Sequence, residues 1–261
     1  KKADIIVENF RSAVKFRLGI DYDEVKKVNS RIIYGSIAGF GQTGPYGKRP
    51  GVDQIAQGMG GLMSITGLPG GGPVRVGIPI CDLTAGIFLA QGIMVALIDR
   101  ETTGKGQWVH TSLLESIIQM LDFQGARWLI KGEVAPQAGN NHPTGTPTGV
   151  FPTSDGHINI AAAGTNLFDR MCEAMGADDL GSDERFRTGD GRTDHREELN
   201  ERISVYSQKK TSDEWIDILN DAGVPCGPIY SIDQMFANEQ VEHLGIAKSV
   251  IHAKLKELKI V

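Results

Sequence analysis

Asp82 is the residue of this chain best suited, by type and position, to chemistry. It follows an apolar segment, residues 74–80, that is predicted to be a strand, and it opens a long apolar helix predicted to end near Arg100. Ligands bind at the carboxyl ends of strands in an open α/β sheet, and a desolvated carboxylate there can act as a nucleophile. Asp is also a favoured N-cap, because it accepts the unpaired N–H groups of a first helical turn. Spacing alone leaves both roles open.

Motifs for other common chemistries are missing from the sequence. It contains no GxxxxGK[ST] phosphate loop, no HExxH and no GxSxG, and Gly58, Gly60 and Gly61 do not make a GxGxxG motif. The six histidines are scattered singly, so no metal site is expected. Cys81, Cys172 and Cys226 are widely spaced, which indicates a reducing compartment and argues against a disulfide framework. We therefore expect a cytoplasmic protein whose chemistry depends on carboxylates and glycine-rich loops.

Composition and charge exclude several classes of protein. The 261 residues carry a formal net charge of -5, but residues 1–50 are basic, with 10 Lys and Arg against 5 Asp and Glu. Such an excess could attract a phosphorylated small molecule, although exposed helix residues such as Lys26 and Lys27 account for part of it. Without stacking aromatics among basic runs, no nucleic-acid partner is expected. The apolar stretch 83–98 is too short to span a bilayer comfortably, so we expect a buried core helix and no membrane association.

The elements that would position Asp82 follow a strand–helix–strand order. Residues 3–9 and 31–37 are predicted strands separated by a helix over 21–29, a spacing typical of a parallel sheet. The expected elements after them are a helix over 52–64, a strand over 107–111 and a long helix over 112–131.

A change in composition marks a second region of the chain. Residues 135–148 are rich in Pro, Gly, Asn and Thr, which is typical of a domain junction. Beyond it, the sequence predicts a hairpin over 149–161, a helix over 165–175, an acidic loop through 190, two helices opened by capping boxes at 194–197 and 211–214, and a strand over 225–230.

Several sequence blocks, in order along almost the whole chain, resemble the family III CoA-transferases of the CaiB/BaiF type. They are residues 7–11 (VENFR), 37–46 (IAGFGQTGPY), 49–53 (RPGVD), 60–67 (GGLMSITG), Asp82 with its helix, 103–107 (TGKGQ), 195–199 (HREEL) and 223–228 (GVPCGP). The resemblance implies an α/β fold with a Rossmann-like parallel-sheet large domain, a smaller α+β domain and an interlocked dimer. We expect domains over 1–134 and 135–236, with 237–261 returning toward a large domain whose N-terminal and C-terminal portions are missing.

The resemblance also implies a role for each candidate site residue. Asp82 corresponds to the family's nucleophile, which forms a mixed anhydride and then an aspartyl-CoA thioester. The positions that correspond to CoA contacts are Asn9, Phe10, Arg11, Arg17, Pro50, Gly51, Val52 and Asp53. Asp53 also matches an acid close to the nucleophile, where it would raise the Asp82 pKa or position the CoA arm. The substrates would be acyl-CoA and small carboxylic acids, with no permanently bound cofactor.

A loop near the junction corresponds to the flexible segment that shields the anhydride, and its residues are Gly139, Asn140, Asn141 and His142. It lacks the run of glycines found in formyl-CoA transferases, which argues against formate or oxalate as substrates.

Two other functions remain as alternatives. An α-methylacyl-CoA racemase shares the fold, but racemases of this type have a histidine where this chain has Val52, and valine cannot carry a proton. A non-catalytic CoA-binding subunit would keep Arg17 and Asn9 without needing a nucleophile.

Overall fold

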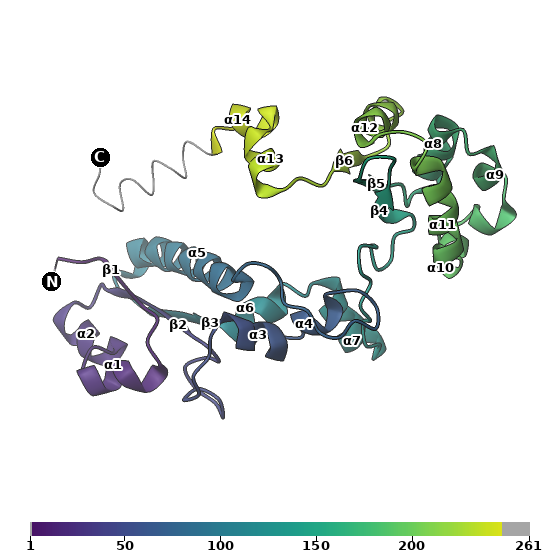
Figure 1. The fold of residues 1–261 in the computed structure, drawn as a ribbon. Coiled ribbons are helices and arrows are strands. Elements are labelled where there is room, and N and C mark those ends of the chain that lie inside the picture. The colour runs from purple at the N-terminus through teal and green to yellow at the C-terminus, as the bar shows by residue number, and fades with distance from the viewer. Residues whose placement is uncertain (1, 247–261) are drawn as a thin grey trace. The chain divides into compact units, whose positions relative to one another are not determined.

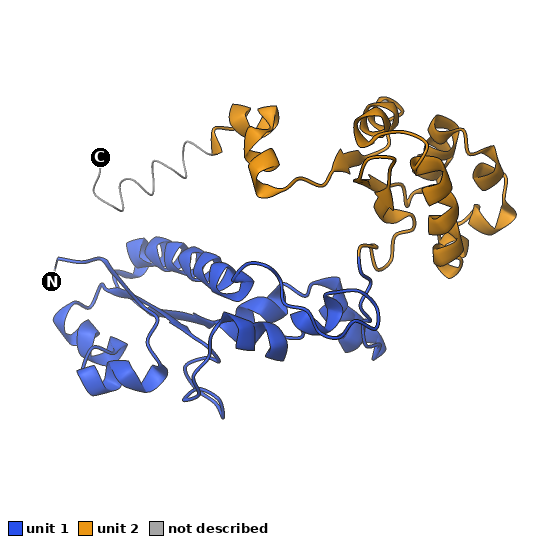
Figure 2. Ribbon diagram, in the orientation of Figure 1, with its two compact units in different colours: residues 1–139 blue, residues 140–261 orange. Residues whose placement is uncertain are grey.

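The computed structural model describes residues 2–246, and the chain divides into two compact units, residues 1–139 and 140–261 (Figure 1, Figure 2). The division falls inside the Pro-, Gly-, Asn- and Thr-rich stretch 135–148. The domain boundaries drawn from the sequence stay a prediction, and most of the expected return segment 237–261 lies outside the described residues.

Unit 1 is built on a parallel sheet of three strands. These are β1 (Ile5–Glu8), β2 (Ile33–Ala38) and β3 (Trp108–Ser112), in the order β1-β2-β3. The register sets Glu8 opposite Ser36 and Ala38 opposite Ser112, so the carboxyl ends of all three strands meet at one edge. The α/β class with a parallel sheet is therefore confirmed.

Helices cover both faces of this sheet (Figure 1). The long helix α5 (Ile80–Thr103) packs on one face so closely that a Cβ at Gly35 would lie 2.9 Å from Ile93 Cδ1. On the other face lie α1 (Ser12–Leu18), which the sequence analysis missed, and α2 (Tyr22–Val28), whose first turn is capped by the Asp21 carboxylate. On that side Tyr34 of β2 donates its hydroxyl proton to the Ile20 carbonyl at 2.7 Å.

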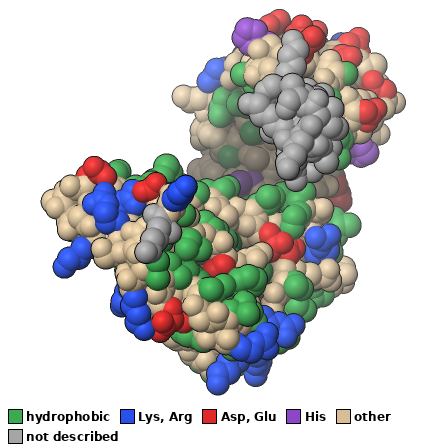
Figure 3. Space-filling view, turned by 90° about the vertical axis from the view of Figure 1, so that its left-hand side faces the viewer, with side chains coloured by type: hydrophobic (Ala, Val, Ile, Leu, Met, Phe, Trp, Pro, Cys, Tyr) green, Lys and Arg blue, Asp and Glu red, His purple; other side chains and the backbone are tan. Residues whose placement is uncertain are grey.

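The prediction that α5 is a buried core helix is wrong for one of its faces. Sheet-facing residues such as Leu89 are buried, but the opposite face exposes Leu83, Ile87, Met94, Val95 and Ile98. Figure 3 shows hydrophobic side chains gathered on the face of unit 1 turned to the viewer. The sequence pattern could not distinguish the two faces, because both are apolar. Within the described residues, α5 is also the one helix long and apolar enough to cross a membrane by length and composition.

The two helices predicted around the site are each interrupted. The segment 52–64 forms α3 (Asp53–Met59) and α4 (Leu62–Ile65), separated by glycines. The segment 112–131 forms α6 (Leu113–Gln119) and α7 (Phe123–Lys131). The second break falls at Asp122, whose φ of 48° is left-handed and so cannot continue an α-helix.

The strand predicted over 74–80 is absent. Its backbone bonds to helix residues instead, since the N–H of Val76 donates to Gln57 Oε1 at 2.9 Å and that of Val74 to the Met63 carbonyl at 3.3 Å. Pro73 and Pro79, which have no N–H, bound the segment and disfavour pairing in a sheet.

Unit 2 contains an antiparallel sheet and a bundle of helices. The strands are β4 (Thr148–Pro152), β5 (His157–Ala161) and β6 (Cys226–Pro228), in the order β4-β5-β6, so the hairpin and the last strand are confirmed. Around them lie α8 (Thr165–Met175), α9 (Asp178–Gly181), the 3-10 helix η1 (Glu184–Phe186), α10 (Gly189–Asp194), α11 (Arg196–Ser207) and α12 (Ser212–Asp221), followed by α13 (Ile232–Ala237) and α14 (Glu239–His243).

The two predicted capping boxes have different outcomes. Thr211 and Glu214 form the reciprocal pair that opens α12, as predicted. The box at Asp194 is wrong, because Asp194 is itself the last residue of α10 and α11 begins after His195 without a side-chain cap. The acidic loop expected before residue 190 is likewise replaced by the short helices α9, η1 and the start of α10.

Candidate functional site

Asp82 is the third residue of α5 and does not cap it. The helix begins at Ile80, and Pro79 precedes it without a capping side chain. Within residues 2–246, the Asp82 carboxylate accepts no hydrogen bond, so the N-cap alternative is wrong and the carboxylate is unoccupied. Asp82 is exposed and lies in the first turn of the helix, where the helix dipole favours negative charge.

Asp82 lies in the wall of a pocket of about 250 Å³ at the carboxyl edge of the parallel sheet. Residues that directly follow or end the three strands form this wall, together with residues at the start of α3 and α5. The lining residues are Asn9, Ile37, Ala38, Gly39, Gly51, Val52, Asp82 and Leu113. The predicted location at the mouth of an open sheet therefore holds, although the preceding strand does not exist.

Two glycines shape this pocket by touching each other. A Cβ on Gly39 would lie 2.6 Å from Gly51 Cα, and a Cβ on Gly51 would lie 2.8 Å from Gly39 Cα. Any side chain at either position would push the two backbones apart. The contact closes the loop 39–51 at its base, directly beside the site.

Asp53 is buried behind the pocket wall and holds the start of α5. Its Oδ1 accepts the backbone N–H of Cys81 at 2.9 Å, and its Oδ2 accepts Gln57 Nε2 at 2.7 Å. The Arg75 guanidinium approaches the same Oδ2 at 3.7 Å and remains partly exposed. Asp53 thus fixes the helical turn that carries Asp82.

Although Asp82 is an exposed residue, partial desolvation of its carboxylate raises its pKa above the usual range, and the nearby Asp53 carboxylate raises this pKa further. A carboxylate that resists ionisation in this way is a stronger base, and hence a better nucleophile, once it is ionised. The neighbouring Cys81 is unsuited to that role, because burial first and Asp53 second raise the pKa of its thiol to about 12.

The remaining predicted CoA contacts lie on the segments that flank the pocket. Phe10 and Arg11 form the turn between β1 and α1, and the Phe10 N–H donates to Glu8 Oε2 at 2.8 Å. Arg17 lies exposed in the last turn of α1, and Pro50 is exposed just before Gly51. The structure thus brings Asn9, Gly51 and Val52 to the pocket itself, whereas Phe10, Arg11, Arg17 and Pro50 lie outside its wall.

The predicted shielding loop crosses the junction between the two units. Gly139 belongs to unit 1 and donates its N–H to the Gly67 carbonyl at 3.0 Å. In unit 2, Asn141 Oδ1 accepts Asn200 Nδ2 at 3.0 Å, and the His142 N–H donates to the Thr148 carbonyl at 2.8 Å. Asn140 lies between them, and the role of the loop stays a prediction.

Sequence analysis missed the charged residues that support the site from inside. Lys15 and Glu8 form a buried ion pair at 3.0 Å. A lysine in a short helix has the same sequence signature as an exposed one, such as Lys26, which pairs at the surface with Asp23. Nothing in the sequence distinguishes the two lysines.

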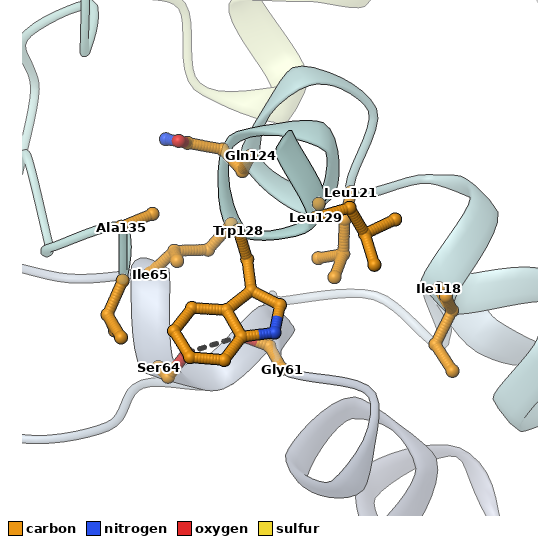
Figure 4. A pocket seen from close by; sticks show the side chains of 11 residues that line it. Gly61, Ser64, Ile65, Ile118, Leu121, Gln124, Trp128, Leu129 and Ala135 are labelled. Atoms are coloured by element: carbon orange, nitrogen blue, oxygen red, sulfur yellow. Dashed lines mark hydrogen bonds between the residues drawn. The ribbon is translucent and has the colours of Figure 1, made fainter. Parts of the chain in front are cut away.

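A second, larger pocket in unit 1 contains no group for acid–base chemistry. It has a volume of about 360 Å³ and lies among α4, α6 and α7, with the Trp128 indole projecting toward Ser64 and Gly61 (Figure 4). Its other lining residues are Ile65, Ile118, Leu121, Gln124, Gly125, Leu129, Val134 and Ala135. Within residues 2–246, no group of three or more His, Cys, Asp or Glu could hold a metal ion. Of these two pockets in unit 1, the one that contains Asp82 is therefore the candidate site.

Comparison with known proteins agrees with this geometry. A family model described as CoA-transferase family III matches residues 1–261. The chain is 37% identical to a succinate–glutarate CoA-transferase of Agrobacterium fabrum (94% of this chain, 62% of the relative) and 38% identical to an acetyl-CoA:oxalate CoA-transferase of Acetobacter aceti (89% and 60%). It also matches the crystal structure of a CAIB/BAIF family protein from Brucella suis, with a TM-score of 0.82 and 35% identity over 93% of this chain and 64% of that one. The chain spans about 60% of the length of these curated relatives.

Proposed function

This chain belongs to CoA-transferase family III, and from that membership we propose that it moves CoA from an acyl-CoA thioester to a free carboxylic acid through a covalent intermediate on Asp82. The observation that carries this proposal is the Asp82 carboxylate, which accepts no hydrogen bond within residues 2–246 and lies in a pocket at the carboxyl edge of the parallel sheet. That edge is where open α/β sheets bind their ligands.

The first half of the reaction loads CoA onto the protein. An Asp82 oxygen attacks the thioester carbonyl, the C–S bond breaks, and CoA leaves as a thiolate while a mixed anhydride forms. The thiolate then attacks the Asp82 carbonyl carbon, which releases the donor acid as a carboxylate and leaves an aspartyl-CoA thioester.

The second half reverses these steps with the acceptor. The acceptor carboxylate attacks the aspartyl thioester and expels CoA thiolate, and the thiolate then attacks the acyl carbonyl of the new anhydride. This attack forms the product thioester and frees Asp82. Because water would hydrolyse either intermediate, the site must close during turnover, which is the role we propose for Gly139, Asn140, Asn141 and His142.

The CoA moiety would bind along the basic segment of unit 1. Arg17 supplies an exposed guanidinium suited to a phosphate group, while Asn9 and Phe10 lie where strand β1 ends. Gly51 and Val52 bring backbone to the pocket wall without a charged side chain, which leaves room for the thioester arm.

We propose short dicarboxylic acids as the acyl groups, with succinate and glutarate favoured over oxalate because the loop 139–142 lacks the glycine run of formyl-CoA transferases. The Agrobacterium fabrum and Acetobacter aceti relatives are named for succinate, glutarate and oxalate. The Arg75 guanidinium beside Asp53 is a partly exposed cation near the site, which supports an anionic acyl group. A screen of succinyl-, glutaryl-, acetyl- and 2-methylacyl-CoA against mono- and dicarboxylic acids tests this choice, and a preference for monocarboxylic acids would contradict it.

The protein would act as a homodimer. Leu83, Ile87, Met94, Val95 and Ile98 are exposed together on one face of α5, and an exposed apolar face of this kind favours contact with another protein surface. Light scattering of the intact protein tests this, because a mass equal to one chain at micromolar concentration would contradict it.

Trapping the covalent intermediate tests the central proposal. After incubation with an acyl-CoA and no acceptor, we expect intact-mass spectrometry to detect a CoA adduct, and peptide mapping to locate it on Asp82. The Asp82→Asn variant is the matched control and should carry no adduct. Transfer without any adduct would rule out the covalent mechanism.

A further inference from the structure

Lys15 is buried inside unit 1 with every ammonium proton used. Its relative exposure is 0%, and its Nζ donates to Glu8 Oε1 at 3.0 Å, Gln42 Oε1 at 2.5 Å and Ser36 Oγ at 3.3 Å. These three acceptors match the three donors of an ammonium group. The charge also lies 4.7 Å from the centre of the Trp108 ring, at a distance typical of a cation–π contact.

The partners of Lys15 belong to the segments on which CoA binding would depend. Glu8 immediately precedes Asn9, and its second oxygen accepts the Phe10 N–H at 2.8 Å. Gln42 belongs to the loop 39–51, which returns to the pocket at Gly51. Lys15 itself lies in α1, two residues before Arg17. One ammonium group therefore fixes three chain segments relative to one another.

A second bond ties the same helix to the same loop. Ser12 Oγ donates to the Gly47 carbonyl at 2.6 Å, so α1 holds the loop 39–51 at two points. The sheet side is equally fixed, because Trp108 Nε1 donates to Ser36 Oγ at 2.8 Å.

Stability alone does not explain such a cluster. A buried ion pair gains little over apolar side chains of the same volume, because both charges lose their hydration. It does impose geometry, since each buried charge needs its partners at fixed places. Lys15 thus contributes more to the placement of its partner residues than to the free energy of folding.

We propose that Lys15 is a positioning residue for recognition of the nucleotide end of CoA. By holding Glu8 and Gln42, it sets the turn 9–11, the loop 39–51 and the helix that carries Arg17 in the arrangement that the ligand requires. This inference rests on the proposed function, because it takes CoA as the ligand.

The test compares the binding of CoA with that of pantetheine, which lacks the nucleotide. In the intact protein, the double variant Lys15→Met/Glu8→Gln removes both charges without leaving one unpaired, and Glu8→Gln keeps an acceptor for Phe10. Gln42→Met, as a milder variant, breaks only the link to the loop. Lys27→Met, on the surface of α2, is the matched control.

Calorimetry should show that CoA binds the double variant at least about tenfold more weakly, so that Kd rises by one decade. Pantetheine affinity and the Lys27→Met control should not change, and Gln42→Met should show the same selective loss to a smaller extent. The ratio of the two affinities is the decisive readout, because simple loss of folded protein would reduce binding of both ligands equally.

Three results would overturn the proposal: equal loss for CoA and pantetheine, no loss for either variant, or no CoA binding by the unaltered protein, which would also refute the proposed function. Because binding is measured without turnover, a protein that binds CoA yet forms no adduct on Asp82 refutes only the covalent mechanism. The affinity ratio then still decides the role of Lys15.

Discussion

The two units of this chain bury their side chains in different ways. Within the described residues, unit 2 has a single core of 16 buried apolar residues, whereas the core clusters of unit 1 contain 5 and 4. Unit 1 instead buries the Lys15–Glu8 ion pair and exposes one face of α5. The candidate site lies in unit 1, whose apolar core is split into two small clusters. Unit 2 has one continuous apolar core.

This difference predicts which substitutions should reduce stability and which should reduce activity. A closely packed core responds to changes in volume, and a polar site responds to changes in charge and geometry. If the comparison is right, stability and transfer can be damaged separately in the two units.

Asp82→Asn should have the largest effect, a loss of activity without a loss of stability. We expect transfer to fall by about a thousandfold or more, because the nucleophile is lost, with CoA binding within a few-fold of the unaltered protein. Since Asp82 caps no helix and its pKa is raised, the variant should be more stable at neutral pH, and this gain should vanish below the pKa of an unfolded aspartate. Transfer assays and thermal melts measure both effects. Turnover near the original rate would contradict the assignment of Asp82 as the nucleophile.

Trp215→Ala should have the converse effect in unit 2. This side chain is 2% exposed, and its Nε1 donates to the Ser207 carbonyl at 2.6 Å, so its removal leaves a cavity and an unpaired carbonyl. We expect a loss of about 3–5 kcal/mol in the free energy of unfolding, measured by denaturant titration. Trp128→Ala, at an exposed position in unit 1, is the control and should cost about 1 kcal/mol or less. Equal losses for the two variants would remove the contrast between the units.

Arg17→Ala should weaken CoA binding by roughly tenfold, the scale of one lost charged contact. Dephospho-CoA should be affected less, because it lacks the terminal phosphate that we assign to Arg17. The salt dependence of CoA binding should also decrease in the variant. Calorimetry with both ligands at two salt concentrations measures this, and equal losses for both would show that Arg17 does not contact that phosphate.

Asp183→Asn should produce a smaller effect, in unit 2 and with the opposite sign to Asp82. Bonds from Arg185 and then Arg202 hold the Asp183 pKa well below its usual range. Its stabilising contribution is therefore complete above the pKa of an unfolded aspartate and is lost as pH falls through the lowered value. Melting temperatures from neutral to strongly acidic pH should converge for the variant and the unaltered protein. A difference that persists in acid would contradict this.

The smallest effect is expected in a test of Val52, which measures deuterium exchange at the α-carbon of the acyl group. Exchange of an α-proton needs an acid or base on each side of the carbon, and this pocket offers an aliphatic side chain beside Asp82. We expect no deuterium at the α-carbon of a 2-methylacyl-CoA incubated with the protein in heavy water. Exchange as fast as acyl transfer would favour the racemase and make Asp82 a proton carrier.

Local sequence signals predicted several elements of the fold correctly, although the capping box at Asp194 failed. The capping box at Thr211 and the helix Thr165–Met175 depend on local patterns, and the strand–helix–strand order predicted the parallel pairing of the N-terminal strands. The errors have non-local or backbone causes. Proline disfavours the strand over 74–80, and a left-handed Asp122 divides the helix over 112–131.

The candidate site was only partly predictable, for the same reason. Asp82 could be recognised by its residue type and neighbours, but its place in the pocket depends on Asp53, which holds the start of α5 from 28 residues away in sequence. The burial of Lys15 depends on Gln42, 27 residues further along. Periodic patterns in a sequence do not indicate contacts between residues that are so far apart along the chain.

The contact between Gly39 and Gly51 has a consequence for how this fold can diversify. A loop whose base is closed by backbone contact can change length at its tip at low entropic cost, because the cost of closing a loop rises only slowly with its length. Residues inserted between Thr43 and Pro45, which are exposed, would leave the nucleophile pocket and the bond from Ser12 to Gly47 in place. The tip is therefore the part of the molecule where recognition of a different thiol carrier could be grafted, by evolution or by engineering, independently of the acyl-transfer chemistry.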